Sequence, residues 1–400
     1  IAPGVYAARD YYNLDPAVYP IVGSHRTFYW NELEPAEDNY AWYKIHDFIA
    51  RNAALGKKSA FGISTYDGIH GSRIGVPDWF ITKYGGFGVV TCPDGHQIPR
   101  YWNSRYLAEY GDFVADMGAA SAGLDGNPNL GWVAIGTGLY GENQPCADYY
   151  DTCLQNEWLT PVLWANTSFE ITQMYADAFS QTPVLFQYAP VYQGDWQRKD
   201  CSDYAASRGA GLLHDGLVPD REKAYGSNVA CDNQAGHWDP IAAHWRNVPI
   251  AFETYRQYLP THVDVYWGFL NGLAKHADYF NAGKCLLNLC NDQLELIEPL
   301  TPRTENFPIF RFANRYAGKT VHNTPSVWIA LRETELSYCP DRGNFSFWLY
   351  QDDSGASGRT VPEWNVGVHK EGRYTRRTDQ STGNYYMYFD IDEAYLYGGV

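Results

Sequence analysis

The 400-residue chain has few basic residues: 30 Lys and Arg stand against 46 Asp and Glu, and the formal net charge is −16. No Lys/Arg-rich run offsets this balance locally, so phosphate backbones and anionic lipid surfaces would be repelled. We therefore expect no nucleic acid and no membrane as partners. The same charge disfavours strongly acidic polysaccharides, unless a local basic pocket overturns it.

The chain also lacks the motifs that identify several other classes of protein. No apolar run approaches the ~18 residues of a transmembrane helix. No glycine-rich nucleotide motif follows a strand-like segment, no cysteines have the zinc-like C-x-x-C spacing, and the start of the sequence does not resemble a signal peptide. Eight cysteines, an even number, favour disulfides and an oxidising compartment. We predict a secreted protein.

Eight cysteines permit 105 pairings, so a pairing predicted from the sequence is only the most local one. It joins Cys146 to Cys153, Cys285 to Cys290, Cys201 to Cys231 and Cys92 to Cys339.

Aromatic residues are abundant, with 14 Trp and 33 Tyr. Their flat faces stack on sugar rings, although a bulky core with a Tyr-rich surface explains the count equally well.

Strand-like and helix-like segments alternate over about 320 residues, and eight such units indicate a (β/α)₈ TIM barrel at residues 1–320. From residue 321 to 400 the segments are short, β-rich and separated by Gly/Ser/Asp turns. We expect a small C-terminal antiparallel β-sandwich-like appendage there, paired with the barrel or incomplete. The expected barrel strands are residues 3–9, 21–30, 58–65, the apolar run from 131, 182–188, 211–216, 248–253 and 279–289.

Two carboxylates end expected strands. Glu142 follows the apolar run from residue 131 on a Gly-rich turn, and Glu253 ends the seventh strand. Active groups of such barrels lie on the loops after the strands, so both are candidates for catalysis. Glycoside hydrolysis uses a pair of carboxylates of this kind.

Two segments carry a family resemblance. After the second strand stands Trp30-Asn31-Glu32-Leu33-Glu34-Pro35-Ala36-Glu37, with Asn39-Tyr40-Ala41-Trp42 beyond it, and after the third stands Val76-Pro77-Asp78-Trp79. They resemble the "W-x-x-L-E-P-x-E-G-x-Y-x-W" and "P-x-W" segments of clan A glycoside hydrolases, closest to family 42 β-galactosidase-like and family 5-like enzymes.

The resemblance implies a retaining hydrolase that needs no cofactor and no metal, with Glu142 as acid/base and Glu253 as nucleophile. Two positions depart from the family pattern. Gly141 stands where these enzymes carry an Asn that bonds the sugar 2-hydroxyl. The tyrosine that steadies the nucleophile from strand six has no match, because His214 and Asp215 occupy that strand end.

Six further residues are candidates for substrate binding, each with a structural alternative. Glu32 belongs to the resembling segment, where Glu34 is expected to brace the loop. Asn143 and Gln144 directly follow Glu142, and His214 ends a strand. Trp79 and Trp238 are candidate sugar platforms. The predicted substrate-binding residues are therefore Glu32, Trp79, Asn143, Gln144, His214 and Trp238.

The sequence thus predicts a retaining hydrolase of β-linked neutral sugars in an oligo- or polysaccharide. Two rivals remain: a catalytically silent carbohydrate-binding barrel, and a secreted structural protein that assembles, as a homo-oligomer for instance, through its Tyr-rich appendage.

Overall fold

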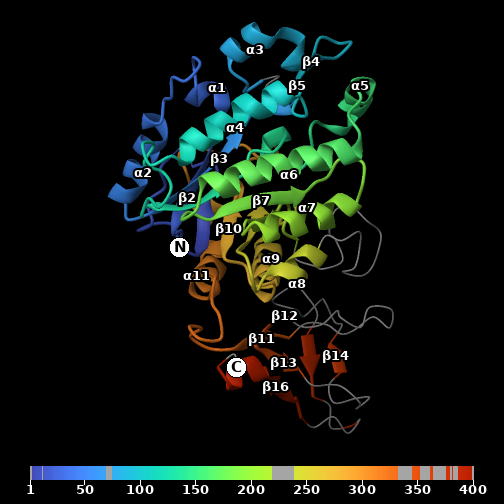
Figure 1. Ribbon diagram of the computed structural model, residues 1–400. Helices are drawn as coiled ribbons and strands as arrows, with labels where there is room; N and C mark the ends of the chain where they lie inside the picture. Colours follow the sequence, from blue (N-terminus) through green and yellow to red (C-terminus); the bar gives the residue numbers. More distant parts are fainter. Residues whose placement is uncertain are drawn as a thin grey trace.

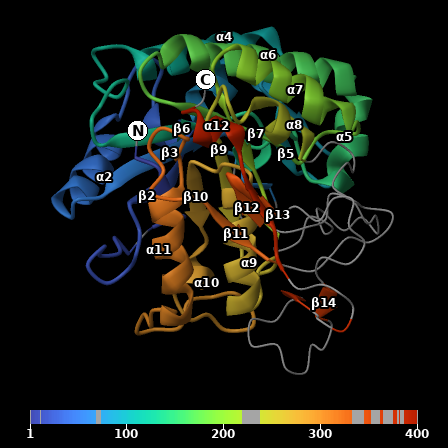
Figure 2. The same cartoon turned by 90° about the horizontal axis from the view of Figure 1, so that it is seen from below.

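Eight parallel strands close into a barrel with helices packed around it (Figures 1 and 2). The computed structural model describes residues 2–10, 12–68, 74–218, 238–331, 345–351, 361–363, 375–378, 381 and 386–398. The expected (β/α)₈ fold is confirmed, and neighbouring strands follow the chain order around the barrel. The strands are β1 (Gly4–Ala7), β2 (Gly23–Tyr29), β3 (Lys58–Ser64), β6 (Leu130–Ala134), β7 (Val184–Ala189), β8 (Gly211–His214), β9 (Ile250–Thr254) and β10 (Tyr279–Ala282).

Amphipathic helices cover the outside of the barrel. Helices α4, α6, α7 and α8 contact one another in that order, and α4, α6 and α7 lie side by side in Figure 1. The helices are α1 (Trp30–Leu33), α2 (Tyr43–Ala54), α3 (Asp78–Tyr84), α4 (Ser104–Gly118), α5 (Asp151–Asn156), α6 (Pro161–Ala178), α7 (Trp196–Ser207), α8 (Asp239–His244), α9 (His262–Ala274), α10 (Lys284–Leu287), α11 (Phe307–Tyr316) and α12 (Glu393–Leu396). A hairpin of β4 (Val89–Thr91) and β5 (Gln97–Pro99) follows α3.

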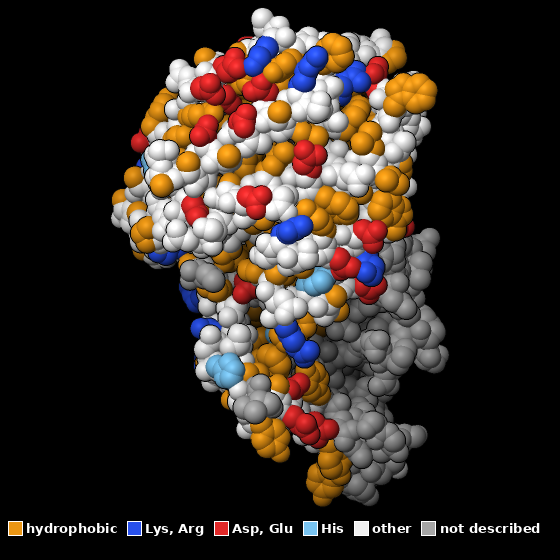
Figure 3. All heavy atoms as spheres, in the orientation of Figure 1, with side chains coloured by type: hydrophobic (Ala, Val, Ile, Leu, Met, Phe, Trp, Pro, Cys, Tyr) orange, Lys and Arg blue, Asp and Glu red, His pale blue; other side chains and the backbone are white. Residues whose placement is uncertain are grey.

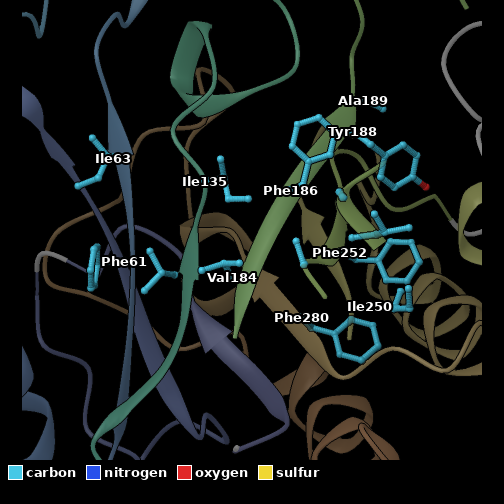
Figure 4. Packing of buried hydrophobic residues seen from close by; sticks show 14 of the residues in the cluster. Phe61, Ile63, Ile135, Val184, Phe186, Tyr188, Ala189, Ile250, Phe252 and Phe280 are labelled. Carbon is cyan, nitrogen blue, oxygen red and sulfur yellow. The ribbon is translucent and has the colours of Figure 1, made fainter. Parts of the chain in front are cut away.

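The barrel strands contribute to two separate apolar clusters because their side chains alternate between the two faces of the sheet. Outward residues such as Phe61, Phe186 and Phe252 pack beneath the helices in the larger cluster (Figure 4). Inward residues fill the barrel interior as a second cluster of Tyr6, Ala60, Trp132, Leu185, Leu213, Ala251 and Tyr279. The barrel is therefore closed by side chains at that level.

The described part of the C-terminal region contains three two-stranded antiparallel sheets. They pair β11 (Trp328–Ala330) with β12 (Phe345–Phe347), β13 (Leu349–Gln351) with β16 (Phe389–Ile391), and β14 (Val361–Glu363) with β15 (Thr375–Arg377). Buried Phe345 packs on Trp267 of α9, with ring centroids 6.1 Å apart. The small appendage is thus attached to the barrel through its helical layer (Figure 1). The division at residue 320 stays a prediction.

Of the predicted disulfides, Cys285–Cys290 is confirmed. The predicted Cys146–Cys153 pair is wrong, because Cys153 on α5 bonds Cys92 in the β4–β5 hairpin instead. This bond also rules out the predicted partner of Cys92, Cys339, which lies outside the described residues. Cys146 and Cys201 are free and buried, so the predicted bond from Cys201 to Cys231, another residue outside the described part, is wrong as well.

Candidate active site

A pocket of about 520 Å³ opens directly above the side chains that fill the barrel. Its lower wall includes inward residues beyond this layer on six of the eight strands, because side chains two positions apart face the same way. Ala251 of β9 lies in the barrel core, for example, and Glu253 lies in the pocket. The inward residues of this wall are His25, Thr27, Gly62, Ala134, Gln187, Glu253 and Asn281.

Glu253 is held by two hydrogen-bond donors. Asn281, its register partner on β10, donates from Nδ2 to Glu253 Oε1 at 3.1 Å. The phenol of Tyr255 donates to Glu253 Oε2 in a short hydrogen bond. Burial and the charge of Glu253 raise the pKa of Tyr255 well above its usual value, so the phenol keeps its proton and remains a donor. The carboxylate is therefore fixed in one orientation.

An uncharged histidine contacts Asn281, one of the two donors to Glu253. His25 on β2 is buried and stacks on Trp132 with centroids 5.0 Å apart. Its Nδ1 lies 3.4 Å from Asn281 Nδ2, which has a second hydrogen to donate. Burial, with help from Arg9, lowers the pKa of His25 to about 3. The imidazole is uncharged at neutral pH and accepts from Asn281 while Asn281 donates to Glu253.

Glu142 is positioned by a loop that folds on itself after β6. The amide of Leu139 donates to the carbonyl of Gln144 at 2.8 Å, and the amide of Glu142 donates to the carbonyl of Leu139 at 2.8 Å. Gly138 permits this closure, because a Cβ there would lie 2.1 Å from the carbonyl oxygen of Gln144. Gly141 has a φ of +91°, a left-handed conformation that favours glycine.

This turn explains why Gly141 stands where the resembling enzymes carry Asn. A β-carbon at position 141 would be strained by the left-handed backbone and would lie 3.2 Å from the carbonyl oxygen of Ile63. The chain therefore cannot present an asparagine from this position without a different loop.

The pKa of Glu142 is raised well above its usual value. Burial is the main cause, and the nearby carboxylates of Asp215 and Glu253 act in the same direction. Gln144, whose Nε2 donates to Glu142 Oε2 at 3.1 Å, and Arg9 oppose the shift. Glu142 therefore carries a proton under conditions in which an ordinary glutamate is ionised.

The pocket thus holds two carboxyl groups with different surroundings. Glu142 is half-buried near other carboxylates and has a raised pKa, and Glu253 accepts two hydrogen bonds. Paired carboxyl groups whose environments differ in this way can act as acid and as nucleophile or base at the same pH.

The other predicted site residues lie in several places. Gln144 contacts Glu142 directly. Asn143 is fully buried and turned away from the pocket: its Oδ1 accepts hydrogen bonds from Trp164 Nε1 at 3.1 Å and from Ser168 Oγ at 2.8 Å. Both partners belong to α6, so Asn143 fixes the loop of Glu142 to that helix.

His214 and Trp238 belong to the helix-facing core. His214 occupies an outward position on β8 and stacks on Trp238 with centroids 4.8 Å apart, and both are buried. Lys275 Nζ lies 4.5 Å from the ring of Trp238 on the outer side. Neither residue lines the pocket, and burial leaves Trp238 no open face for a sugar.

The segments that carry the family resemblance are joined to one another by hydrogen bonds outside the pocket. Trp30 Nε1 donates to Glu34 Oε2 at 2.7 Å, and the amide of Asp38 donates to Glu34 Oε1 at 3.0 Å, as expected for a bracing residue. Trp79 Nε1 donates to the carbonyl of Glu34 at 3.2 Å. Glu32 pairs with Arg26 at 3.1 Å in a separate surface groove. Neither Glu32 nor Trp79 lines the pocket.

Four residues around the two glutamates were not predicted from the sequence: Arg9, His25, Tyr255 and Asn281. The two-residue period of strand side chains could have indicated two of them, His25 and Asn281. Asn281 is inward because it lies two positions after Tyr279, as Glu253 lies two positions after Ala251. Tyr255 and Arg9 follow the ends of their strands, where the period no longer applies.

Comparisons with known proteins find similar solved structures. Neither a protein-family model nor a curated protein matches the chain. Among solved structures, the exo-β-1,4-mannosidase Op5Man5 from Opitutaceae bacterium strain TAV5 has a TM-score of 0.45 and 12% sequence identity. The match covers 78% of this chain and 59% of the mannosidase. This similarity carries no functional argument, so the function of the protein is inferred from the pocket.

Two further findings concern the described residues only. No helix among them is long and apolar enough to cross a membrane. No group of three or more of their His, Cys, Asp or Glu side chains is placed to hold a metal ion.

Proposed function

We propose that the protein is a secreted retaining glycoside hydrolase that cleaves β-linked sugars with Glu142 and Glu253. The observation that carries this proposal is that two carboxyl groups with different surroundings line one pocket: Glu142, near other carboxylates that help to raise its pKa, and Glu253, oriented by two donors. The two disulfides among the described residues agree with secretion.

The first step would break the glycosidic bond. Glu253 attacks the anomeric carbon, and the bond to the leaving oxygen breaks as Glu142 gives that oxygen its proton. The product of this step is a glycosyl ester of Glu253 and a free alcohol. The raised pKa of Glu142 suits this role because the acid must hold its proton until substrate binds.

The second step would restore the enzyme. The ionised Glu142 removes a proton from a water molecule, the oxygen of that water attacks the anomeric carbon, and the bond to Glu253 breaks. Two displacements at one carbon leave its configuration unchanged. The sugar is therefore released as the β-anomer.

The test compares three isosteric variants on a panel of aryl β-glycosides. Glu142→Gln and Glu253→Gln should each lower kcat by at least about 100-fold, the effect typical of losing acid–base catalysis. Glu32→Gln is the matched control, since Glu32 lies in a separate groove. Proton NMR of the first sugar released should show the β-anomer. Turnover like that of the unaltered protein in either catalytic variant would contradict the proposal.

A binding protein without turnover is the second candidate, and Gly141 is the observation that favours it. The left-handed backbone there excludes the asparagine that contacts the 2-hydroxyl in the resembling enzymes. Gln187 and Asn281 are among the pocket-lining amides that would have to replace it. Saturable sugar binding with no product in the same assays would support this candidate.

A further inference from the structure

The pocket gathers positive charge within an acidic chain. Three cations line it, Arg9, Arg256 and Lys284, whereas the chain as a whole has a net charge of −16. They follow β1, β9 and β10, which are neighbours in the barrel, so all three share one side of the mouth. Figure 3 shows acidic side chains spread over the barrel half of one outer face. The basic residues of the pocket therefore depart from the charge of the molecule as a whole.

The carboxyl groups of the pocket do not cancel this charge. Three line it: Asp10, Glu142 and Glu253. Asp10 is paired with the buried Lys57, whose Nζ lies 3.1 Å from Asp10 Oδ2. Glu142 holds its proton because of its burial. Among the pocket-lining carboxyl groups, Glu253 is then left without a balancing cation of this kind, while Arg256 and Lys284 line the same pocket.

Arg256 and Lys284 lie close in the chain to the groups that define the reaction centre. Arg256 directly follows Tyr255, the phenol that donates to Glu253, and Lys284 lies three residues after Asn281. The chain segment that carries each cation therefore also carries a hydrogen-bond donor to Glu253. A sugar bound against Glu253 shares the pocket with both cations.

The partners of Arg256 hold its side chain without removing its charge. Its Nη1 donates to the carbonyl oxygens of Cys290 at 3.0 Å and Asn291 at 3.3 Å. Both acceptors are neutral, and the Cys285–Cys290 disulfide closes the loop that carries the first of them. Lys284 is exposed at the pocket rim. Neither cation forms an ion pair with a described residue.

We propose that the substrate carries an anionic oxygen group, a carboxylate or a sulfate ester, on the sugar beside Glu253, and that Arg256 and Lys284 bind this group. A guanidinium fits the planar fork of a carboxylate or the oxygens of a sulfate, and a lysine adds a mobile point charge. The inference rests on the proposed function, because it concerns the same pocket. It replaces the neutral sugar predicted from the net charge of the chain.

The experiment compares matched substrate pairs on the full chain. Aryl β-glucoside is paired with aryl β-glucuronide and with its 6-sulfate, and aryl β-galactoside is paired with aryl β-galacturonide. The unaltered protein should prefer one anionic member by at least about tenfold in kcat/KM, the size of a modest charge contact. Which anion is preferred, carboxylate or sulfate, distinguishes the two sources. Added salt should reduce the preference because it screens exposed charges.

Variants then assign the preference to the two cations. Lys284→Gln should reduce the ratio of anionic to neutral kcat/KM several-fold, and Lys284→Glu should reduce it further. Arg256→Lys should retain part of the ratio because it keeps the charge but loses the fork. Lys58→Gln is the matched control, since Lys58 begins β3 at the opposite end of the barrel and binds the carbonyl of Pro128.

The outcomes separate this inference from the proposed function. Turnover of neutral glycosides alone, or a ratio that Lys284→Glu does not change, would overturn the inference and leave the hydrolase intact. Where no substrate is turned over, calorimetric titration with glucuronate, galacturonate and glucose 6-sulfate against the neutral sugars decides. Preferential binding of an anion that Lys284→Glu abolishes would support the inference alone, and equal or absent binding would overturn it.

Discussion

The loop after β6 and the end of β9 each supply one glutamate to the pocket, and they do so in different ways. The position of Glu142 depends on a backbone turn whose amide groups donate to carbonyl groups of the same turn. Glycines at positions 138 and 141 allow this turn. Glu253 depends on the alternation of a regular strand and on side-chain donors from β10 and from its own loop. One position is thus fixed by the main chain and the other by side chains.

This difference determines which substitutions each glutamate tolerates. A side-chain atom added in the turn should displace the Glu142 carboxyl group without contacting that group itself. Around Glu253 the backbone continues a ladder of the sheet, so a substitution should change the hydrogen bonds of the carboxylate rather than its place. The predictions below test this contrast.

The largest effect is expected from Gly138→Ala. The added Cβ would meet the carbonyl oxygen of Gln144 at 2.1 Å and that of Glu142 at 2.9 Å, and neither is a flexible side-chain end. The turn must open, so we expect kcat/KM to fall by about 100-fold or more, as for other small displacements of reacting groups. Thermal unfolding should show a loss of about 1–3 kcal/mol.

Gly86→Ala is the matched control for this substitution, because a Cβ at Gly86 meets nothing within 4 Å. If Gly138→Ala behaved like the control in both activity and unfolding, the self-bonded turn would not be what positions Glu142.

A smaller effect is expected from Tyr255→Phe, which removes one donor to Glu253 and keeps the ring. Loss of a hydrogen bond to a charged group should lower kcat/KM by about tenfold. The thermal unfolding midpoint should change little, since the strand is unaltered. A fall in kcat with little change in KM would identify the phenol as a positioning residue, because it acts through the orientation of Glu253. Unchanged kcat would contradict this role.

The same contrast explains how much of the site the sequence predicts. The alternation of strands and helices, with apolar strands and capped amphipathic helices, predicts the barrel, and strand ends predict the places of Glu142 and Glu253. Their partners are harder to predict. His214 and Asp215 are adjacent, and only the phase of β8 sends His214 into the helix layer while Asp215 lies close enough to raise the pKa of Glu142.

Other features depend on contacts between segments far apart in the chain. Asn143 follows a predicted acid and looks like a substrate ligand, but α6 supplies the donors that bury it. Trp238 stands in a polar stretch, yet it packs on His214. Cys153 bonds a hairpin that no local pairing would suggest. The two segments that resemble glycoside hydrolases correctly predict the barrel. Their residues Trp30, Glu34 and Trp79 nevertheless bind one another outside the pocket.

The smallest and most specific effect concerns stability and pH. The folded protein raises the pKa of Glu142 above the 4.5 of an exposed glutamate, so the folded state binds its proton more tightly than the unfolded state. The stability associated with this proton is complete below about pH 4.5 and is lost as pH rises toward the folded-state pKa. The Glu142→Gln variant has no ionisable group at this position, so it should not lose stability for this reason as pH rises.

Unfolding measured from pH 4 to pH 8 should therefore show the Glu142→Gln variant gaining stability relative to the unaltered protein as pH rises. Glu253→Gln should instead be destabilised, because its amide group brings N–H donors toward the donors of Tyr255 and Asn281. A difference for Glu142→Gln that stays constant with pH would show that Glu142 is ionised in the folded pocket. The two glutamates would then lack the contrast on which their assigned roles depend.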